Sequence, residues 1–533
     1  MNPALIFLLI GWAFVLVWVP LVVLSQRKMH PKALFTLFFT EMWERFSFYG
    51  MRSFLVLYMA GQLFMEMSRG DADTRALGIY GAFNALLYAA PVVGGMIADK
   101  ILGFRRTIMI GGISMALAQF ILAFNAFTLN NEMLFFTGLA LLTVGNGFFK
   151  PNISSFLGTF YDKNDNRKDG AFTIFYMGIN IGAFLAPLTC AYLAEEINWG
   201  LGFLAAGIGM LLGIIVFWNN MSKYEDKGNP PNPMSLKEAF FGGMTLPQII
   251  ILGSLLIVPV FAFLINYEGI TNIILLLSGV AVLGYIIYFV VTDNNKEDGQ
   301  RLLVFLALFF FHMYFWLLFE QAGGALTILA NRFVDRQGFT AGQLQSLNPL
   351  FIMLLAPVFS WFWVQLSKRK KEPRTPMKFF YGLLQIAFGF WIIVLGAKSV
   401  LPSLAGVPMP TDESPLNPAQ MIPLLFLVFM YLFHTTGELS ISPVGLSVVT
   451  KLSPARMVGF IMGAWFLSIA FAHKIAGKLG QTIASPGEGA GASEALQAYV
   501  DVYMQWGVYI TIAAALVLLL LSPILKKWMH GVH

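Results

Sequence analysis

The stretch that decides the fold runs from Ala33 to Gly61 and reads ALFTLFFTEMWERFSFYGMRSFLVLYMAG. It is long enough to cross a bilayer, which takes about 20 mostly apolar residues in a helix. Its middle nevertheless carries four charged side chains, Glu41, Glu44, Arg45 and Arg52. Inserting one charge at the centre of a spanning helix costs about 2.5–3.5 kcal/mol. We therefore expect these side chains to face a watery cavity or one another.

The composition of the whole chain indicates that lipid is its solvent. Of 533 residues, 57% are hydrophobic and 12% are charged, against roughly 25% charged residues in a soluble domain. The 50 glycines fit the close packing of membrane helices. The single cysteine, Cys190, excludes an internal disulfide and a cysteine-based metal site.

Fifteen segments are long and apolar enough to be spanning helices. They lie near residues 4–25, 33–61, 76–98, 106–128, 132–160, 171–192, 199–219, 246–267, 270–292, 301–330, 343–367, 377–399, 420–448, 455–481 and 500–525. Segment 4–25 could instead be a signal peptide, but no basic residue precedes it and no small-residue cleavage site follows, so we interpret it as an uncleaved helix. Residues 221–232 are typical of a solvated linker.

Short basic loops alternate with loops that are poor in Lys and Arg, and this alternation predicts the topology. Examples are Lys100 with Arg105 and Arg106, the run Lys368–Lys371, and Lys526 with Lys527. The positive-inside rule places these loops in the cytoplasm, with the C-terminus inside and the N-terminus outside. The net charge of +6 therefore reflects the basic loops that orient the chain in the membrane, and we expect no nucleic-acid partner.

The charges of segment 33–61 share one face. At 100° per residue, positions 41, 45, 48 and 52 fall within about 60° of one another, and position 44 borders that face. A structural pair between Glu41 and Arg45 at i, i+4 is the simpler alternative.

Further charges stand in other apolar segments, namely Lys150, Glu320 and Glu438. Buried cations can hold a carboxylate and a buried carboxylate can hold an ammonium, which suits a zwitterionic ligand. A desolvated carboxylate beside a competing cation can also change its protonation state when that partner moves. Each charge taken alone could instead be part of a packing ion pair.

Four motifs give a specific resemblance. The run Glu41–Arg52 resembles the ExxER motif of the proton-dependent oligopeptide transporter (POT or PTR) family, and Gly94–Arg106 resembles a loop signature of the wider major facilitator superfamily. The run Gly145–Asn152, continued by Phe172–Ala183, is similar to the family's second signature, and Gly437–Pro443 to the motif of its tenth core helix.

The resemblance, to the prokaryotic type, implies an all-α polytopic membrane protein with the major facilitator fold. Two six-helix bundles would surround a central cavity and alternate between outward and inward openings. The implied divisions are an extra N-terminal helix at 1–32, a first bundle at 33–220, a linker with an inserted helix pair at 221–300 and a second bundle at 301–533.

The resemblance also implies roles for individual residues. Substrate contact would come from Arg45, Tyr49, Arg52, Tyr88, Lys150, Tyr176, Asn180, Trp316, Asn348, Glu438, Ser442 and Trp465. Proton coupling would involve Glu41, Glu44, Arg45, Lys150 and Glu320. Arg52 with Glu320, and Lys150 with Glu438, resemble gating salt bridges. For each aromatic residue, plain packing is the alternative.

The chain departs from the family pattern at two informative positions. Phe48 stands where many members have a Tyr, and Gly81 stands where mammalian members have a His that handles protons. Proton coupling should therefore rest on carboxylates.

These observations predict a symporter that imports di- and tripeptides with protons, as a monomer in the bacterial inner membrane, with no metal or other cofactor. Relatives that carry nitrate are the alternative, although an ammonium-binding Glu438 disfavours it. A membrane enzyme is not expected, because neither HExxH nor GxSxG occurs and the six histidines lack ligand spacing. A channel would show passive flux without dependence on a proton gradient.

Overall fold

The protein is described by a computed structural model over residues 2–162, 165–234, 236–293, 295–411, 414–484 and 490–532. Helices dominate these residues, which confirms the prediction of an all-α membrane protein. The strands among them are short: β1 (Ala239–Phe241) pairs antiparallel with β2 (Met244–Thr245), and β3 (Val334–Asp335) pairs parallel with β4 (Ile422–Pro423).

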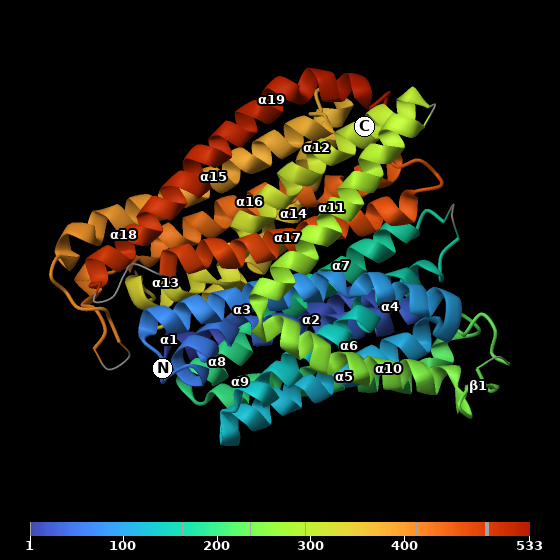
Figure 1. Cartoon of the computed structure of the whole chain (residues 1–533), viewed down its shortest axis with the longest axis horizontal. Coiled ribbons are helices and arrows are strands. Elements are labelled where there is room, and N and C mark those ends of the chain that lie inside the picture. The colour runs from blue at the N-terminus through green and yellow to red at the C-terminus, as the bar shows by residue number, and fades with distance from the viewer. Residues whose placement is uncertain are drawn as a thin grey trace. The chain divides into compact units, whose positions relative to one another are not determined.

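The α-helices follow one another along the chain with few long connections (Figure 1). Their bounds are α1 (Pro3–Gln26), α2 (Lys32–Tyr58), α3 (Arg69–Ala89), α4 (Pro91–Ile97), α5 (Gly103–Phe124), α6 (Glu132–Gly158), α7 (Lys168–Ala186), α8 (Tyr192–Glu196), α9 (Trp199–Asn219), α10 (Leu246–Asn266), α11 (Glu268–Thr292), α12 (Lys296–Phe319), α13 (Ala325–Phe333), α14 (Leu347–Lys368), α15 (Thr375–Val400), α16 (Leu424–Leu452), α17 (Val458–Ala484), α18 (Ala492–Val502) and α19 (Thr511–Trp528). Tighter or wider helical turns extend several of them, including η4 (Pro187–Ala191), η6 (Glu320–Gly323) and η10 (Tyr503–Ile510).

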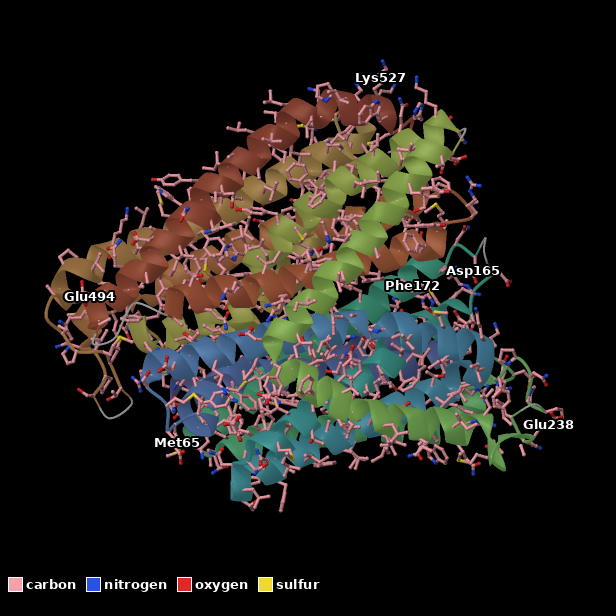
Figure 2. All side chains as sticks on the ribbon, in the orientation of Figure 1. Met65, Asp165, Phe172, Glu238, Glu494 and Lys527 are labelled. Carbon is pink, nitrogen blue, oxygen red and sulfur yellow. The ribbon has the colours of Figure 1, made fainter. Side chains whose placement is uncertain are left out.

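Thirteen helical stretches of the described residues are long and apolar enough to cross a membrane. The number differs from the predicted fifteen for two reasons. The stretch Arg69–Leu129 counts once although it contains two predicted segments, and α2 is not counted because its charged residues lower its hydropathy. The charged side chains labelled in Figure 2, Asp165, Glu238, Glu494 and Lys527, lie in loops or in terminal helical turns, where water can reach them.

The chain forms two compact units. Unit 1 consists of Met1–Leu63, Leu86–Tyr267 and Gly338–Pro349, and unit 2 of Phe64–Ala85, Glu268–Gln337 and Leu350–His533. These units differ from contiguous bundles at 33–220 and 301–533, because residues 64–85 pack with unit 2 and residues 338–349 pack with unit 1. The inserted helix pair is also divided, since α10 belongs to unit 1 and α11 to unit 2. The four domain boundaries remain predictions.

In unit 1, helix α2 is the centre of the packing, with α7 and α9 against it and α5, α6 and α10 in sequence beside them (Figure 1). Glycines on α7 permit the close approach of α7 to α2. A Cβ on Gly182 would stand 2.2 Å from the backbone oxygen of Met42, and one on Gly178 would stand 2.8 Å from the ring of Phe38. Small residues spaced by four are the usual way for membrane helices to pack closely.

Helix α1 packs on the same unit, although most of its side chains remain exposed. The indole Nε1 of Trp12 donates to Thr189 Oγ1 in η4 at 2.9 Å, and Phe7 makes edge contacts with Phe184 and Phe339. The amide of Gln343 donates to the backbone oxygen of Ala4 at 3.1 Å. The extra helix is thus held by specific contacts, and its apolar outer face suits lipid.

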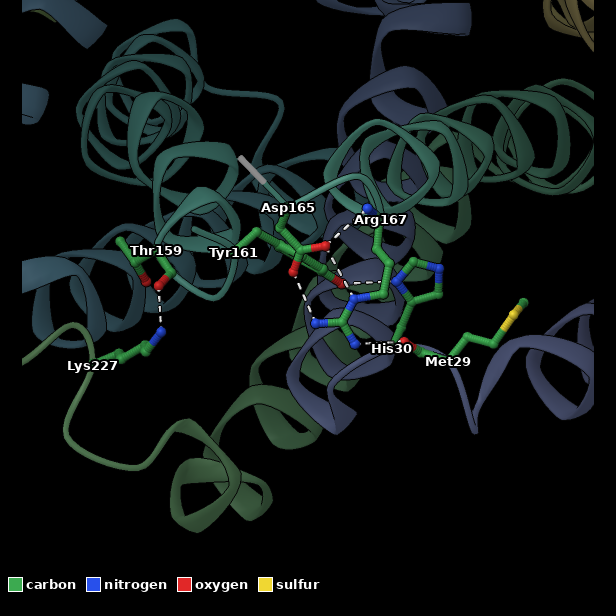
Figure 3. A network of polar contacts seen from close by, with 7 residues as sticks. All are labelled: Met29, His30, Thr159, Tyr161, Asp165, Arg167 and Lys227. Atoms are coloured by element: carbon green, nitrogen blue, oxygen red, sulfur yellow. Dashed lines mark hydrogen bonds and ion pairs between the residues drawn. The ribbon is translucent and has the colours of Figure 1, made fainter. Parts of the chain in front are cut away.

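A polar network joins the loop after α1 to the loop before α7 (Figure 3). Arg167 donates to the backbone oxygen of Met29 at 3.0 Å and pairs with Asp165 at 2.8 Å, while His30 Nδ1 lies 3.1 Å from Tyr161 Oη. The hydrogen bond from Arg167 lowers the pKa of Asp165 to about 2. Burial, and then the Arg167 charge, lowers the pKa of His30, and burial raises the pKa of Tyr161 to about 12.

In unit 2, α15 packs against α16 and α19, and α12 packs against α17 (Figure 1). Helix α11 of the inserted pair contacts α12 and α17, and its first residue, Glu268, pairs with Lys474 of α17 at 2.6 Å. Gln481, about two helical turns further on, also donates to Glu268 at 2.7 Å. Helix α11 is therefore fixed to a core helix through its N-terminal turn.

Candidate functional site

Three charged side chains of α2 form a buried ion cluster in unit 1. Arg45 Nε lies 2.8 Å from Glu41 Oε1 and 2.8 Å from Glu44 Oε2. Their side chains are 7%, 3% and 0% exposed, so almost no water screens the charges. The predicted pair at i, i+4 is present, and Glu44 joins it from the border of the face. Two carboxylates for one guanidinium leave the cluster with one excess negative charge unless a proton is bound.

The position of this cluster follows from the packing of α7 on α2. The Cβ that Gly182 lacks would also stand 2.9 Å from Cβ of Arg45. A larger residue at position 182 would push the two helices apart at the level of the cluster. The glycine therefore lets α7 cover the base of the Arg45 side chain and exclude water from that side.

Two further cations of unit 1 lie over aromatic rings. Lys150 Nζ is 3.8 Å from the ring centroid of Tyr88, and Arg52 Cζ is 5.7 Å from that of Tyr49. Cation–π contacts of this kind stabilise a charge by about 0.5–2 kcal/mol. Lys150 is half-buried and Arg52 is 8% exposed. Each predicted cation thus has a predicted tyrosine beside it.

The α7 residues of the predicted site differ in exposure. Tyr176 is 45% exposed and Asn180 is 5% exposed, and Asn180 Nδ2 donates to the backbone oxygen of Tyr176 at 2.9 Å. Asn348, at the start of α14, is half-buried and also belongs to unit 1.

In unit 2 the predicted tryptophans contact a histidine that sequence reasoning missed. Trp316 Nε1 donates to His312 Nε2 at 2.9 Å, and His312 Nδ1 lies 2.8 Å from Ser468 Oγ. Ser468 in turn donates to the backbone oxygen of Trp465 at 2.6 Å. Because Nε2 accepts a bond, the imidazole is neutral and donates through Nδ1. The sequence could have indicated this contact, because His312 and Trp316 are four residues apart on α12.

Trp465 itself is buried in the core of unit 2, at 2% exposure, with its ring centroid 4.0 Å from that of His312. The structure therefore places it in packing contact with His312. Glu438 and Ser442 lie half-buried on α16. Among the described residues, Ser442 Oγ has no hydrogen-bond partner.

Glu320 is buried just after the end of α12, and it lies close to another histidine that the sequence did not single out. Its Oε2 lies 3.7 Å from His473 Nδ1, and both side chains are at most 3% exposed. The pairings of Arg52 with Glu320 and of Lys150 with Glu438 each join residues of different units and remain predictions.

Gly81 is tightly packed at the position where mammalian members of the family that the chain resembles have a histidine. Helices α3 and α17 meet at this point in unit 2, and a Cβ on Gly81 would stand 3.0 Å from Cα of Gly477. The described residues contain no group of three or more His, Cys, Asp or Glu side chains placed to hold a metal ion.

Comparisons with known proteins agree with this arrangement. The POT family model matches residues 105–496. A peptide transporter of Yersinia enterocolitica is 36% identical over 93% of this chain and 94% of its own length. Dipeptide and tripeptide permease A of Cronobacter turicensis is 33% identical over 93% of both chains, and an uncharacterized Bacillus subtilis transporter, YclF, is 36% identical over 94% of this chain and 96% of its own.

Solved structures give the same result for the fold. A peptide transporter of the family, crystallised with sulfate, superposes with a TM-score of 0.77 at 33% identity and covers 94% of this chain and 96% of that one. A family transporter crystallised with 5-aminolevulinic acid gives a TM-score of 0.76 at 28% identity, over 93% and 97% of the two chains. The major facilitator fold is therefore confirmed. The family model and the relatives match the chain over most of its length, and the charged helix and the glycine-packed bundle agree with them. The chain therefore belongs to the POT family of membrane transporters.

Proposed function

We propose that this protein imports di- and tripeptides together with protons by alternating access in the bacterial inner membrane. Relatives named as peptide transporters and dipeptide and tripeptide permeases support the substrate class. We further propose that it acts as a monomer with its C-terminus in the cytoplasm, that it needs only protons as coupling ions, and that it catalyses no covalent reaction.

The single observation that carries the proposal is the buried cluster of Glu41, Glu44 and Arg45. A cluster with one excess negative charge is unfavourable in a water-poor environment, and one proton on either carboxylate makes it neutral. Protonation also releases part of the hold on Arg45. The guanidinium can then bind the carboxylate of an incoming peptide, so proton uptake and peptide binding favour each other.

The remaining predicted residues would bind both ends and the backbone of a zwitterionic peptide. Lys150 would share the peptide carboxylate with Arg45, and Glu438 would receive the ammonium. Asn180, Tyr49 and Tyr88 carry groups that can bond a peptide backbone. This division of charge distinguishes a peptide from nitrate, which has no ammonium, and the peptide-named relatives favour the same choice.

Uptake of labelled dialanine into proteoliposomes under an imposed pH gradient tests the proposal. We expect the native protein to accumulate dialanine, a protonophore to abolish accumulation, and Glu41→Gln or Glu44→Gln to lower gradient-driven uptake at least about tenfold, as the loss of a proton-transfer group does. The matched control is Glu66→Gln, because Glu66 is an exposed carboxylate in the loop after α2.

Uptake that survives both the protonophore and the α2 variants would refute proton coupling. Competition by excess nitrate but not by unlabelled dipeptide would refute the peptide substrate. Glu438→Gln adds a finer test, since it should weaken competition by dialanine more than competition by an N-acetylated dipeptide.

A further inference from the structure

A large apolar groove runs between four helices of unit 2, outside the predicted peptide site. Its volume is about 1120 Å³, and its walls come from α14, α15, α16 and α19 with η10. The walls are formed largely by aromatic side chains, Phe359, Phe362, Trp363, Phe388, Trp391 and Phe433. All of these residues belong to the same compact unit, and Figure 1 shows α15 and α19 side by side.

The groove walls are ordered by ring contacts and one ion pair. Phe388 stacks on Trp391 with centroids 5.4 Å apart and meets Phe433 edge-on at 4.6 Å. Lys378 Nζ lies 4.9 Å from the ring centroid of Trp363 and 2.6 Å from Glu372 Oε1. Lys378 therefore packs on the indole of Trp363 while its charge is balanced by Glu372.

The interior offers almost nothing to a polar ligand. Gln385 and Ser440 are lining residues that could donate or accept hydrogen bonds, but Gln385 Nε2 already donates to Ser440 Oγ at 3.2 Å. A peptide in this groove would lose its hydrogen bonds to water without replacement, which is unfavourable. An acyl chain has no such loss.

One end of the groove is strongly basic. Lys371 lines the groove itself, and it belongs to a set of five exposed cations at the end of α14 and in the loop that follows it: Lys368, Arg369, Lys370, Lys371 and Arg374. Within the described part of the chain, none of the five takes part in an ion pair. Clusters of Lys and Arg directly beside a spanning helix attract anionic lipid headgroups, at about 1 kcal/mol per residue near the surface.

We propose that the groove is a binding site for one anionic phospholipid. The acyl chains lie along the aromatic walls between α14 and α15, and the phosphate contacts Lys371 and Arg369. The combination of an apolar groove and a basic rim at the same end fits an amphiphile with a negative headgroup. A zwitterionic lipid has the same chains but gains little from the cations.

Quenching of tryptophan fluorescence by brominated lipids tests the site in the full-length protein reconstituted into nanodiscs. The quenchers are phosphatidylglycerol and phosphatidylcholine with dibrominated acyl chains. The chain has 12 tryptophans, so the signal of the groove must be isolated. It is obtained by subtracting the quenching of the Trp363→Phe variant from the quenching of the native protein. We expect half-maximal quenching of this signal at an about tenfold lower fraction of phosphatidylglycerol than of phosphatidylcholine, which is about 1.4 kcal/mol.

Matched charge variants show which cations produce the preference for phosphatidylglycerol over phosphatidylcholine. Arg369→Gln with Lys371→Gln should remove it, whereas Lys526→Gln with Lys527→Gln, which neutralises two exposed lysines at the end of α19, should leave it unchanged. In the native protein, raising the salt concentration should weaken the preference without any mutation, because exposed charges are screened.

Three outcomes would overturn the proposal. They are equal quenching by the two lipids in the native protein, an unchanged preference in the Arg369 and Lys371 variant, and no quenching of Trp363 by either lipid. Because the readout is lipid binding, it is independent of whether the protein transports peptides.

Discussion

At the scale of single residues, the chemistry of this protein is concentrated in one and a half turns of α2. Glu41 and Glu44 both reach Arg45 at 2.8 Å, and helical geometry alone brings them there, since residues three and four apart share a face. Water exclusion makes the cluster sensitive to any change in its charge. Breaking a buried ion pair by removing one partner commonly costs about 3–5 kcal/mol, whereas replacing all partners with neutral groups costs much less.

Arg45→Gln should therefore lower the apparent melting temperature of the purified protein, because two buried carboxylates lose their cation. Adding Glu41→Gln and Glu44→Gln to that variant should recover most of the lost stability, yet uptake of dialanine should remain absent. Thermal unfolding followed by tryptophan fluorescence, with uptake measured in parallel, separates the two effects. A triple variant that is less stable than the single one would contradict the role of charge balance.

The His30 network gives a pH dependence with a defined sign. Burial and the Arg167 charge lower the pKa of His30, so the folded state keeps the ring neutral where the unfolded state already binds a proton. Stability should therefore fall as the pH drops through about 6.5, the ordinary value for histidine. Asp165, whose pKa is lowered to about 2, and Tyr161, whose pKa is raised to about 12, do not titrate in this window.

His30→Gln should accordingly reduce the loss of melting temperature between pH 7.5 and pH 5.5. His530→Gln is a suitable control, because His530 is an exposed histidine at the other end of the chain. Equal pH dependence of the native protein and the His30 variant would show that other groups govern it.

At the scale of elements, glycines decide how close the helices come. The ideal Cβ of Gly182 would be 2.2 Å from a backbone oxygen of α2, and backbone cannot move aside as a side chain can. The glycines of α7 thus set the distance between two helices that both carry predicted site residues. Gly81 is a second tight position, because a Cβ there would stand 3.0 Å from Cα of Gly477 where α3 meets α17.

Gly182→Ala should destabilise the protein by about 1–3 kcal/mol, as overpacking of a tight interface does. Gly284→Ala is the matched control, because Gly284 lies inside α11 and its Cβ would meet nothing within 4 Å. Alanine there should be neutral or stabilise by up to about 1 kcal/mol. Similar melting temperatures for the two variants would contradict the close packing of α7 on α2.

At the scale of the whole molecule, the compact units do not follow the order of the chain. Residues 64–85 pack within unit 2, and one contact that holds them is a pair of hydrogen bonds between Arg332 and Asp73, one of them 2.8 Å long. Their side chains are 13% and 5% exposed. Gln481 supports the same segment by donating to the backbone oxygen of Thr74 at 3.1 Å.

The ion pair between Asp73 and Arg332 fastens residues 64–85 to α13 within unit 2. Asp73→Asn should therefore lower both the melting temperature and the uptake of dialanine, because it leaves a mostly buried guanidinium without its carboxylate. Exchanging the two charges, Asp73→Arg with Arg332→Asp, should restore part of each. The single variants Asp73→Arg and Arg332→Asp are the controls. If the double variant has no higher melting temperature and no faster uptake than the worse of these two, attraction between residues 73 and 332 does not explain their effect.

The sequence by itself determined the membrane class, the helical segments, the family and the charged cluster of α2. These features are local: hydropathy is read along the chain, the motifs are contiguous, and Glu41, Glu44 and Arg45 lie within five positions of one another. The departure at Gly81 was also visible in the sequence, although its reason was not.

Only the tertiary structure decided which distant residues meet. His312 and Ser468 are 156 positions apart, and the bond that orients the ring toward Trp316 depends on how α12 packs on α17. The burial of Trp465, the proximity of His473 to Glu320 and the basic-rimmed groove depend on the same kind of packing. Periodicity fixes the face on which a side chain lies, but the partner on that face is set by helix crossings that hundreds of weak contacts determine together.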